Sequence, residues 1–318
     1  MLSACLDSIV RNLGQDLPCE TVIVLNGSPE PVRRLVHDDV SGATVVESGV
    51  NRGVAGGYNL ARSAARGELL VVLHDDTEVW PGWLEALVAA TDERPEAGAV
   101  GSKALNADGT LQSAGARVLA NGRTEPLGRG EPADAPAYQQ RTEVDYSGSN
   151  SLLVRAATWD AVGGMDERFF PAYHVDVDLG TAIRALGQVV LYEPASVVTH
   201  HRWGATTDER FRAFAASRNL ARYVAKWQSE SGLSEDTPSS ELDYLRLDLE
   251  LKDAYIRELD SEVDVLRGHL TGIEESRTWR AKRMLSRLAA ASRKRSFRSV
   301  DRSGTYPDAR DRTGESES

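Results

Sequence analysis

Short apolar segments alternate with helical segments along the first third of this chain, and no other feature constrains the fold as strongly. The helical segments, such as residues 3–12 and 83–90, repeat apolar side chains every three to four positions. The strand-like segments are short and apolar, and they cover residues 21–25, 43–47, 68–73 and 99–104. Strands that alternate with helices at these lengths form parallel sheets with helices on both faces. The sequence therefore predicts an α/β fold with a doubly wound, mostly parallel central sheet.

Composition and charge exclude several classes of protein. Of the 318 residues, 41% are hydrophobic, and the formal net charge is -11. This acidity would repel nucleic-acid phosphates, so no nucleic-acid partner is expected. Cys5 and Cys19 are too few for a disulfide framework or a zinc site, which favours reduced thiols in a cytoplasmic protein. We expect neither a signal peptide nor a bilayer-spanning segment, so membrane contact would be peripheral, at the inner face of the plasma membrane.

An acidic pair follows one of the apolar segments. Asp75 and Asp76 come directly after residues 68–73, and a carboxylate just past a buried strand lies at the sheet edge where ligands bind. Adjacent carboxylates repel each other unless a cation or hydrogen-bond donors compensate. A bound Mg²⁺ or Mn²⁺ would do so, and it would also neutralise a leaving diphosphate. The alternative is a helix cap, because a turn and a helix follow.

A second acidic pair lies in the second half of the chain. Asp176 and Asp178 stand two residues apart at the start of a helix predicted over 178–186, so their side chains should point in different directions. One carboxylate can face the cleft as a general base for an acceptor hydroxyl. The other can cap the helix or pair with Arg184. His200 ends the next strand, and it could be a metal ligand, a base or a histidine satisfied within the core.

Residues 51–59 contain three glycines ahead of a predicted helix. Gly53, Gly56 and Gly57 would let the backbone approach a ligand, and exposed N–H groups at a helix start favour phosphate. Glycines at a strand-to-helix turn are also common for packing alone. Their spacing does not match the dinucleotide fingerprint, so a nicotinamide-binding enzyme is not expected.

The chain changes character after Trp227. Residues 229–240 are polar and contain Gly, Pro and Ser, which predicts a linker. Residues 241–275 then carry a heptad pattern with two apolar series, namely Leu242, Leu249, Ile256, Val263 and Leu270, and Leu245, Leu259, Leu266 and Ile273 with Lys252 as the one polar member. This pattern predicts a coiled coil, most simply a homodimer. The alternative is one amphipathic helix folded back on the preceding domain.

Basic and apolar residues are interleaved over residues 276–302. A basic amphipathic helix beside an acidic body is typical of a contact with a membrane surface. The alternative is a solvated basic tail. Residues 303–318 are polar and are predicted to be disordered.

Taken in order, these segments resemble the family-2 inverting glycosyltransferases with the GT-A fold, especially the bacterial rhamnosyltransferase-like branch that builds cell-surface polysaccharide. The resemblance runs from about residue 2 to residue 204. It rests on residues 23–28, the Asn-x-Gly segment at 51–59, His74-Asp75-Asp76 at the place of the metal-binding Asp-x-Asp motif, residues 148–155, the acceptor-side segment at 163–170, and then Asp176, Asp178, Arg184, Gly187, Tyr192, Pro194 and His200.

The resemblance implies a GT-A domain over residues 1–228. This domain would move a sugar, with inversion, from a nucleotide-diphosphate-sugar to a hydroxyl of a cell-surface glycan or lipid-linked acceptor. Asp76 and His200 would hold Mg²⁺ or Mn²⁺ on the diphosphate, and Asp176 would be the general base. The implied donor-binding residues are Asn26, Asn51, Gly53, Gly57, Asn59 and Asp75, and the implied acceptor-binding residues are Asp166, Glu167 and Asp178.

Departures from the family pattern leave a second hypothesis open. The family's first strand, with its nucleotide loop, would precede residue 2, so we expect the sheet to lack that strand. Leu25 stands where the family usually has an Asp, His74 replaces the first acid of Asp-x-Asp, and Val175 replaces a Glu. The alternative is a catalytically inactive glycosyltransferase-like scaffold that acts through its coiled coil. A nucleotidyltransferase of similar fold would need a basic glycine-rich loop, which we do not find.

Overall fold

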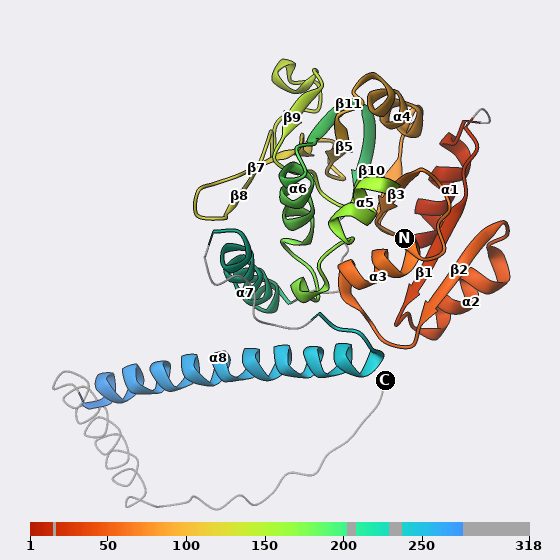
Figure 1. Cartoon of the computed structure of the whole chain (residues 1–318). Coiled ribbons are helices and arrows are strands. Elements are labelled where there is room, and N and C mark those ends of the chain that lie inside the picture. The colour runs from red at the N-terminus through yellow and green to blue at the C-terminus, as the bar shows by residue number, and fades with distance from the viewer. Residues whose placement is uncertain (15–16, 202–207, 229–236, 276–318) are drawn as a thin grey trace, which may run out of the picture. The chain divides into compact units, whose positions relative to one another are not determined.

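The computed structural model describes residues 1–14, 17–201, 208–228 and 237–275. The chain divides into two units, Met1–Tyr255 and Ile256–Ser318. The first unit contains the α/β domain and the start of the last helix, and the second continues that helix (Figure 1). The predicted basic tail at 276–302, the disordered end at 303–318 and most of the 229–240 linker lie outside the described residues.

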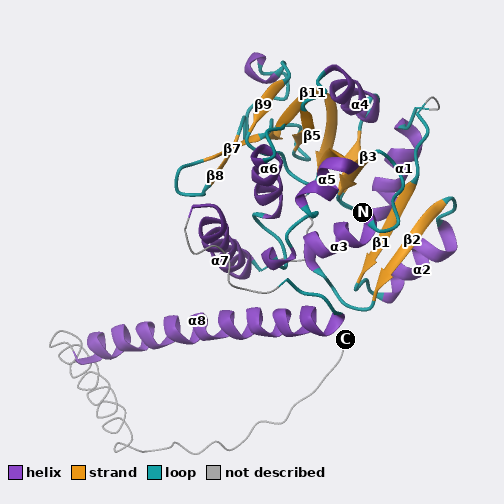
Figure 2. Ribbon diagram, viewed as in Figure 1, coloured by secondary structure: helices purple, strands orange, loops and turns teal. Residues whose placement is uncertain are grey.

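The main sheet contains seven strands, and Figure 2 draws strands in orange, with β3, β5, β9, β10 and β11 of this sheet labelled. Its principal order is β3 (Leu69–Leu73), β10 (Ser151–Arg155), β5 (Ala97–Leu105), β11 (Val189–His200) and β4 (Thr77–Val79), with β6 (Leu111–Ser113) on β5 and β9 (Thr142–Val144) on β11. Both β3 and β5 pair antiparallel with β10, while β11 pairs parallel with β5 and antiparallel with β4. Therefore β3, β5 and β11 run in one direction, and their carboxyl ends share one edge of the sheet.

Two smaller sheets accompany the main one. β1 (Thr21–Asn26) and β2 (Ala43–Ser48) form a parallel pair, and β7 (Ala116–Val118) and β8 (Thr124–Pro126) form a hairpin. Among the described strands, β1 pairs only with β2 and β3 only with β10, so the first three strands do not share one ladder. The predicted α/β class is confirmed. The main sheet is mixed, because β4, β6, β9 and β10 run against β3, β5 and β11.

The helices of the described residues are α1 (Leu2–Asn12), α2 (Glu30–Asp39), α3 (Gly53–Arg62), α4 (Trp83–Glu93), α5 (Ala156–Val162), α6 (Val175–Ala185), α7 (Glu209–Gln228) and α8 (Glu241–Glu275), with short 3₁₀ turns at Pro136–Tyr138 and Glu167–Phe169. Of these, α4 packs on one face of the main sheet and α6 on the other. α8 spans the heptad pattern within the described residues, whereas its coiled-coil pairing stays a prediction. None of the helices in the described part of the chain combines the length and apolar character that crossing a membrane requires.

The core lies on both faces of the sheet because strand side chains alternate between them. On β11, Leu191 packs with Leu87 of α4, while Val190 and Tyr192 belong to the cluster that contains Leu179 of α6. α6 is thereby fixed on one face of the sheet. It begins at Val175, so Asp176 and Asp178 lie within its first turn rather than ahead of it.

Candidate active site

Three potential metal ligands meet at the carboxyl ends of β3 and β11. His74 and Asp76 follow β3, and His200 is the last residue of β11. The pairing of β4 with β11 sets Thr77 opposite His200, which brings the adjacent Asp76 to the same point. Oδ1 of Asp76 lies 3.1 Å from Nε2 of His200 and 3.9 Å from Nδ1 of His74, and the two nitrogens are 3.4 Å apart. We call these three residues the triad.

The size and chemistry of the triad fit a divalent cation. Octahedral ligands about 2.1 Å from an ion lie about 3 Å from one another, which is close to the shortest side of this triangle. One carboxylate oxygen and two imidazole nitrogens are established ligands of divalent transition metals. His74 replaces an acid of the family motif, and the structure places it where it supplies a third ligand atom.

Hydrogen bonds aim both imidazoles into the triad. Nδ1 of His200 lies 2.7 Å from Oε1 of Gln112, and because an amide oxygen only accepts, Nδ1 donates and the ring is held with Nε2 toward Asp76. The amide of Gln112 is fixed in turn, since its Nε2 donates to Oδ1 of Asn106 and to the carbonyl of His200. Nε2 of His74 lies 3.4 Å from Oγ of Ser149. Burial lowers the pKa of His74 to about 4, so its imidazole is neutral at neutral pH.

The predicted base lies beside the triad. Asp176 is partly buried, and its carboxylate accepts hydrogen bonds from the backbone N–H groups of Val177, at 3.0 Å, and Ser149. Burial raises the pKa of Asp176, while these N–H donors act in the opposite direction. Because Oγ of Ser149 also contacts His74, one residue links the predicted base to the triad.

Tyr58 is a site residue that the sequence motifs do not single out, although it lies in the 51–59 segment. Its ring stacks over His74 with the ring centroids 6.2 Å apart, and its hydroxyl donates to the carbonyl of Ser149 at 3.3 Å. Burial and then the charges of Asp75 and Asp76 raise the pKa of Tyr58, so its hydroxyl stays protonated. Asp75 is exposed at the same edge, next to the buried Asp76.

The residues predicted to bind the donor gather at the start of α3, where their polar groups bond to one another. Oδ1 of Asn26 accepts from the N–H of Arg52 at 2.8 Å, and Nδ2 donates to the carbonyl of Gly53 at 2.9 Å. Oδ1 of Asn51 accepts from the N–H of Gly53 at 2.7 Å. Asn26 and Asn51 therefore tie the end of β1 to the start of α3.

Close packing explains why glycine stands at two positions of this segment. Gly53 has a φ of +69°, and a Cβ there would lie 2.6 Å from the carbonyl oxygen of Pro171. That oxygen accepts from the N–H of Val54 at 2.8 Å. A Cβ on Gly57 would lie 3.1 Å from Nδ2 of Asn26. The N–H groups of Gly53 and Val54 are thus occupied within the protein, which corrects the expectation that they are exposed for phosphate.

Asn59 also has an internal role. Its Nδ2 donates to the carbonyl of Met165 at 2.8 Å and to Oε1 of Glu167 at 2.7 Å, while its Oδ1 accepts from the N–H of Met165 at 3.0 Å. Burial raises the pKa of Glu167. The structure therefore joins a predicted donor-binding residue to a predicted acceptor-binding one, and both stabilise the segment that precedes α6.

Asp166 and Asp178 share the cation of Lys226, and Asp166 also pairs with Arg168 at 2.6 Å. Nζ of Lys226 on α7 lies 2.8 Å from a carboxylate oxygen of each, and Nε1 of Trp227 donates to Asp178 at 2.6 Å. Arg184 pairs with Asp145, at 2.9 Å, so the alternative in which Asp178 pairs with Arg184 is not formed. Two of the three predicted acceptor-binding carboxylates, Asp166 and Asp178, are thus engaged inside the domain, where they tie α6 and the segment before it to α7.

α7 also holds the loop that leads to Asp176. The buried Asn219 donates from Nδ2 to the carbonyls of Phe169 and Ala172, each at 2.7 Å, and of Tyr173 at 3.2 Å. Tyr173 and His174 have φ angles of 70° and 61°, a region that residues other than glycine rarely adopt. Such a backbone persists only where its surroundings hold it, and Asn219 provides that support.

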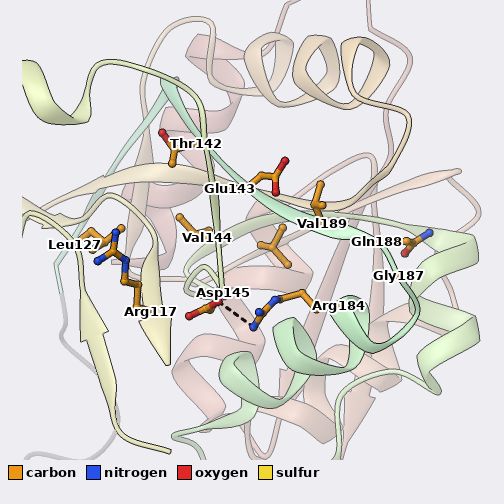
Figure 3. Close-up of a pocket in the computed structure, with 11 residues that line it drawn as sticks. Arg117, Leu127, Thr142, Glu143, Val144, Asp145, Arg184, Gly187, Gln188 and Val189 are labelled. Carbon is orange, nitrogen blue, oxygen red and sulfur yellow. Dashed lines mark ion pairs between the residues drawn. The ribbon is translucent and has the colours of Figure 1, made fainter. Parts of the chain in front are cut away.

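A pocket of about 420 Å³ lies at the other end of α6 (Figure 3). Arg184 and Asp145 pair across part of its wall, and Arg117 and Glu143 come from the neighbouring strands β7 and β9. Neither Asp176 nor any member of the triad lines it. This pocket is therefore distinct from the candidate active site.

Comparison with known proteins defines the class of this chain as a glycosyltransferase. The model of glycosyl transferase family 2 matches residues 1–161, just over half of the 318 residues. The chain therefore belongs to glycosyltransferase family 2.

Similar proteins agree with this family. The N-acetylglucosaminyl-diphospho-decaprenol L-rhamnosyltransferase of Mycobacterium tuberculosis is 28% identical over 219 residues, which are 61% of this chain and 70% of that protein. The O-antigen biosynthesis protein RfbC of Myxococcus xanthus is 36% identical over 149 residues, which are 45% of this chain and 12% of that protein. The crystal structure of GalNAc-T7 with UDP, GalNAc and Mn²⁺ matches 81% of this chain and 53% of that chain, with a TM-score of 0.54 and 14% identity, which supports the GT-A fold.

Removing the side-chain amide of Asn219 should loosen the loop that carries Asp176. We expect Asn219→Ala to lower the free energy of unfolding by about 1–3 kcal/mol, because three carbonyls lose a buried donor. Urea denaturation followed by circular dichroism measures the change. Asn121→Ala, at an exposed asparagine that bonds only locally to Arg123, is the matched control and should change stability by less than about 0.5 kcal/mol. Equal stability of the two variants would contradict the role of Asn219.

Proposed function

We propose that this chain transfers a sugar, with inversion, from a nucleotide-diphosphate-sugar to a hydroxyl of a cell-surface glycan or lipid-linked acceptor. The observation that carries the proposal is the contact of Ser149 with both Asp176 and His74, which joins a general base to a candidate metal site. The relatives support the acceptor class, since one is named as a rhamnosyltransferase acting on N-acetylglucosaminyl-diphospho-decaprenol and another as an O-antigen biosynthesis protein. A cytoplasmic location and contact with the membrane surface accord with such an acceptor and stay predictions.

The triad would hold a divalent ion on the diphosphate of the donor. His74, Asp76 and His200 offer two nitrogens and one oxygen, and this donor set favours Mn²⁺ over Mg²⁺, which prefers oxygen ligands. The solved GalNAc-T7, which contains Mn²⁺ and UDP, agrees with this preference. When bound, the ion supplies positive charge that stabilises the leaving diphosphate. Asp75, exposed beside the triad, is the candidate for further contact with the donor.

Asp176 would take the proton of the acceptor hydroxyl. Its raised pKa makes it a stronger base than an exposed carboxylate, and the N–H groups of Val177 and Ser149 keep it oriented. The hydroxyl oxygen then attacks the anomeric carbon from the face opposite the diphosphate. The bond between that carbon and the diphosphate oxygen breaks, and the anomeric configuration inverts.

The remaining predicted residues would support this chemistry indirectly, by holding the segments around the site in place. We propose that Asn26, Asn51, Gly53, Gly57 and Asn59 shape the donor side through the bonds and close packing that fix the start of α3. We propose that Asp166 and Asp178 position the acceptor side through Lys226, and that Glu167, half-buried beside Asn59, lies nearest to an acceptor among these carboxylates.

Asp176→Asn should abolish proton abstraction and leave donor binding intact. We expect the transfer rate to fall by about 10²- to 10⁴-fold, because the amide cannot accept the proton. Steady-state transfer assays measure the rate, and calorimetric titration with nucleotide-sugar and Mn²⁺ measures donor binding. Asp92→Asn, at an exposed position on α4, is the control and should behave as wild type. Transfer at the normal rate by Asp176→Asn would exclude it as the base.

Gln112→Ala should weaken metal binding without removing a ligand atom. Nδ1 of His200 loses its acceptor, so the imidazole is no longer held with Nε2 toward the triad. We expect the affinity for Mn²⁺ to fall by about 10- to 100-fold. Titration followed by the electron paramagnetic resonance of free Mn²⁺ gives the affinity, with the exposed Gln140→Ala as control. Unchanged affinity in Gln112→Ala would show that His200 does not need this partner or does not bind the ion.

A further inference from the structure

α8 carries two apolar stripes on opposite sides of its first turns. Residues two positions apart are separated by about 200° around a helix. Tyr244, Leu247 and Leu251 form one stripe, and Leu242, Leu245 and Leu249 form the other. A helix that only folded back on its own domain would need one apolar stripe.

The Tyr244 stripe is the one that packs within the first unit. Tyr244 and Leu251 are each 1% exposed, and they form a cluster with Phe170 in the loop before Asp176. The guanidinium of Arg52 lies over the Tyr244 ring at 5.3 Å, and Oε1 of Glu241 accepts from the N–H of Gly49 at 3.1 Å. The start of α8 is therefore anchored by this side of the helix.

The opposite stripe is exposed. Leu242, Leu245 and Leu249 have exposed fractions from 46% to 66%. The same heptad series continues in the second unit through exposed side chains at Ile256, Val263, Leu266, Leu270 and Ile273. If α8 only folded back on the preceding domain through its heptad positions, the Leu242 series would be buried. The structure instead buries the Tyr244 stripe. A long exposed apolar stripe of this kind marks an interaction surface.

We propose that the exposed stripe binds the same stripe of a second copy of this chain, as a parallel two-stranded coiled coil. With Leu242 as position a, the central heptads have the β-branched Ile256 and Val263 at a, and Leu259 and Leu266 at d. This distribution favours parallel dimers over larger assemblies. Lys252 is the one polar d residue, and such a residue fixes register at some cost in stability.

Charged residues flank the exposed stripe. Glu262 at position g and Arg267 at the following position e place opposite charges across a parallel pair, although Arg267 also lies 3.3 Å from Asp264 of its own helix. Asp248 and Asp253 place like charges at the same positions nearer the start, where Asp248 pairs with Lys252 of its own helix at 2.6 Å, so the apolar a and d residues carry the proposal. Tyr244, Leu247 and Leu251 fall at outer c and f positions. The stripe that packs within the first unit is therefore not the one proposed to pair.

Val263 and Val265 give a matched test of this face. Both are exposed valines on α8, but Val263 is at position a and Val265 at the outer position c. In analytical ultracentrifugation of the full chain, we expect twice the mass of one chain for wild type and Val265→Asp, and a dissociation constant at least 100-fold weaker for Val263→Asp. A monomeric or trimeric wild type, or equal weakening by both substitutions, would overturn the proposal.

Cysteine cross-linking tests the parallel orientation without relying on a destabilised variant. In a Cys19→Ser background, Val263→Cys should form a disulfide-linked dimer in air, because equal a positions face each other in a parallel pair. Val265→Cys should not. Absence of the Val263→Cys cross-link in a chain that sediments as a dimer would exclude the parallel arrangement.

Discussion

The antiparallel pairing of β4 with β11 is the constraint on which the candidate site depends. It sets Thr77 opposite His200, so a histidine at the end of one strand meets Asp76, which follows a strand far away in the sequence. The parallel pairing of β11 with β5, and the place of β10 between β5 and β3, fix His74 in the same sheet. A shift of this register by one residue would separate Nε2 of His200 from Oδ1 of Asp76, which now lie 3.1 Å apart.

α7 holds the segment that leads to Asp176. Lys226 lies between Asp166 and Asp178, and Arg168 also pairs with Asp166, so two cations compensate the two carboxylates. Burial tends to raise the pKa of Asp166, yet hydrogen bonds from Arg168 and Lys226 prevail and hold it at about 2. Asn219 meanwhile holds the left-handed loop at Tyr173 and His174. The position of Asp176 thus depends on a helix that contributes no group to the chemistry.

The local sequence pattern predicts helices and strands of this fold. It does not predict the contacts between residues that are far apart in the sequence. Apolar runs and helical periodicity predict the strands at β1, β3 and β5 and a helix over the heptad segment of α8, because burial of one face dictates both. The antiparallel insertion of β10 left no local mark. The family pattern shows His74 only as the loss of an acid, although imidazole is itself a metal ligand. The internal partners of Asn59 and Asp178, which are Glu167 and Lys226, become neighbours only in the folded chain, so no local pattern predicts them.

The most direct test asks whether His74, Asp76 and His200 bind one metal ion together. Pulsed electron paramagnetic resonance of the full chain loaded with Mn²⁺ detects the nitrogen of each coordinating imidazole. We predict coupling to two imidazole nitrogens, with one lost in His74→Ala and the other lost in His200→Ala. A spectrum without imidazole coupling, or one that neither substitution changes, would contradict the central claim.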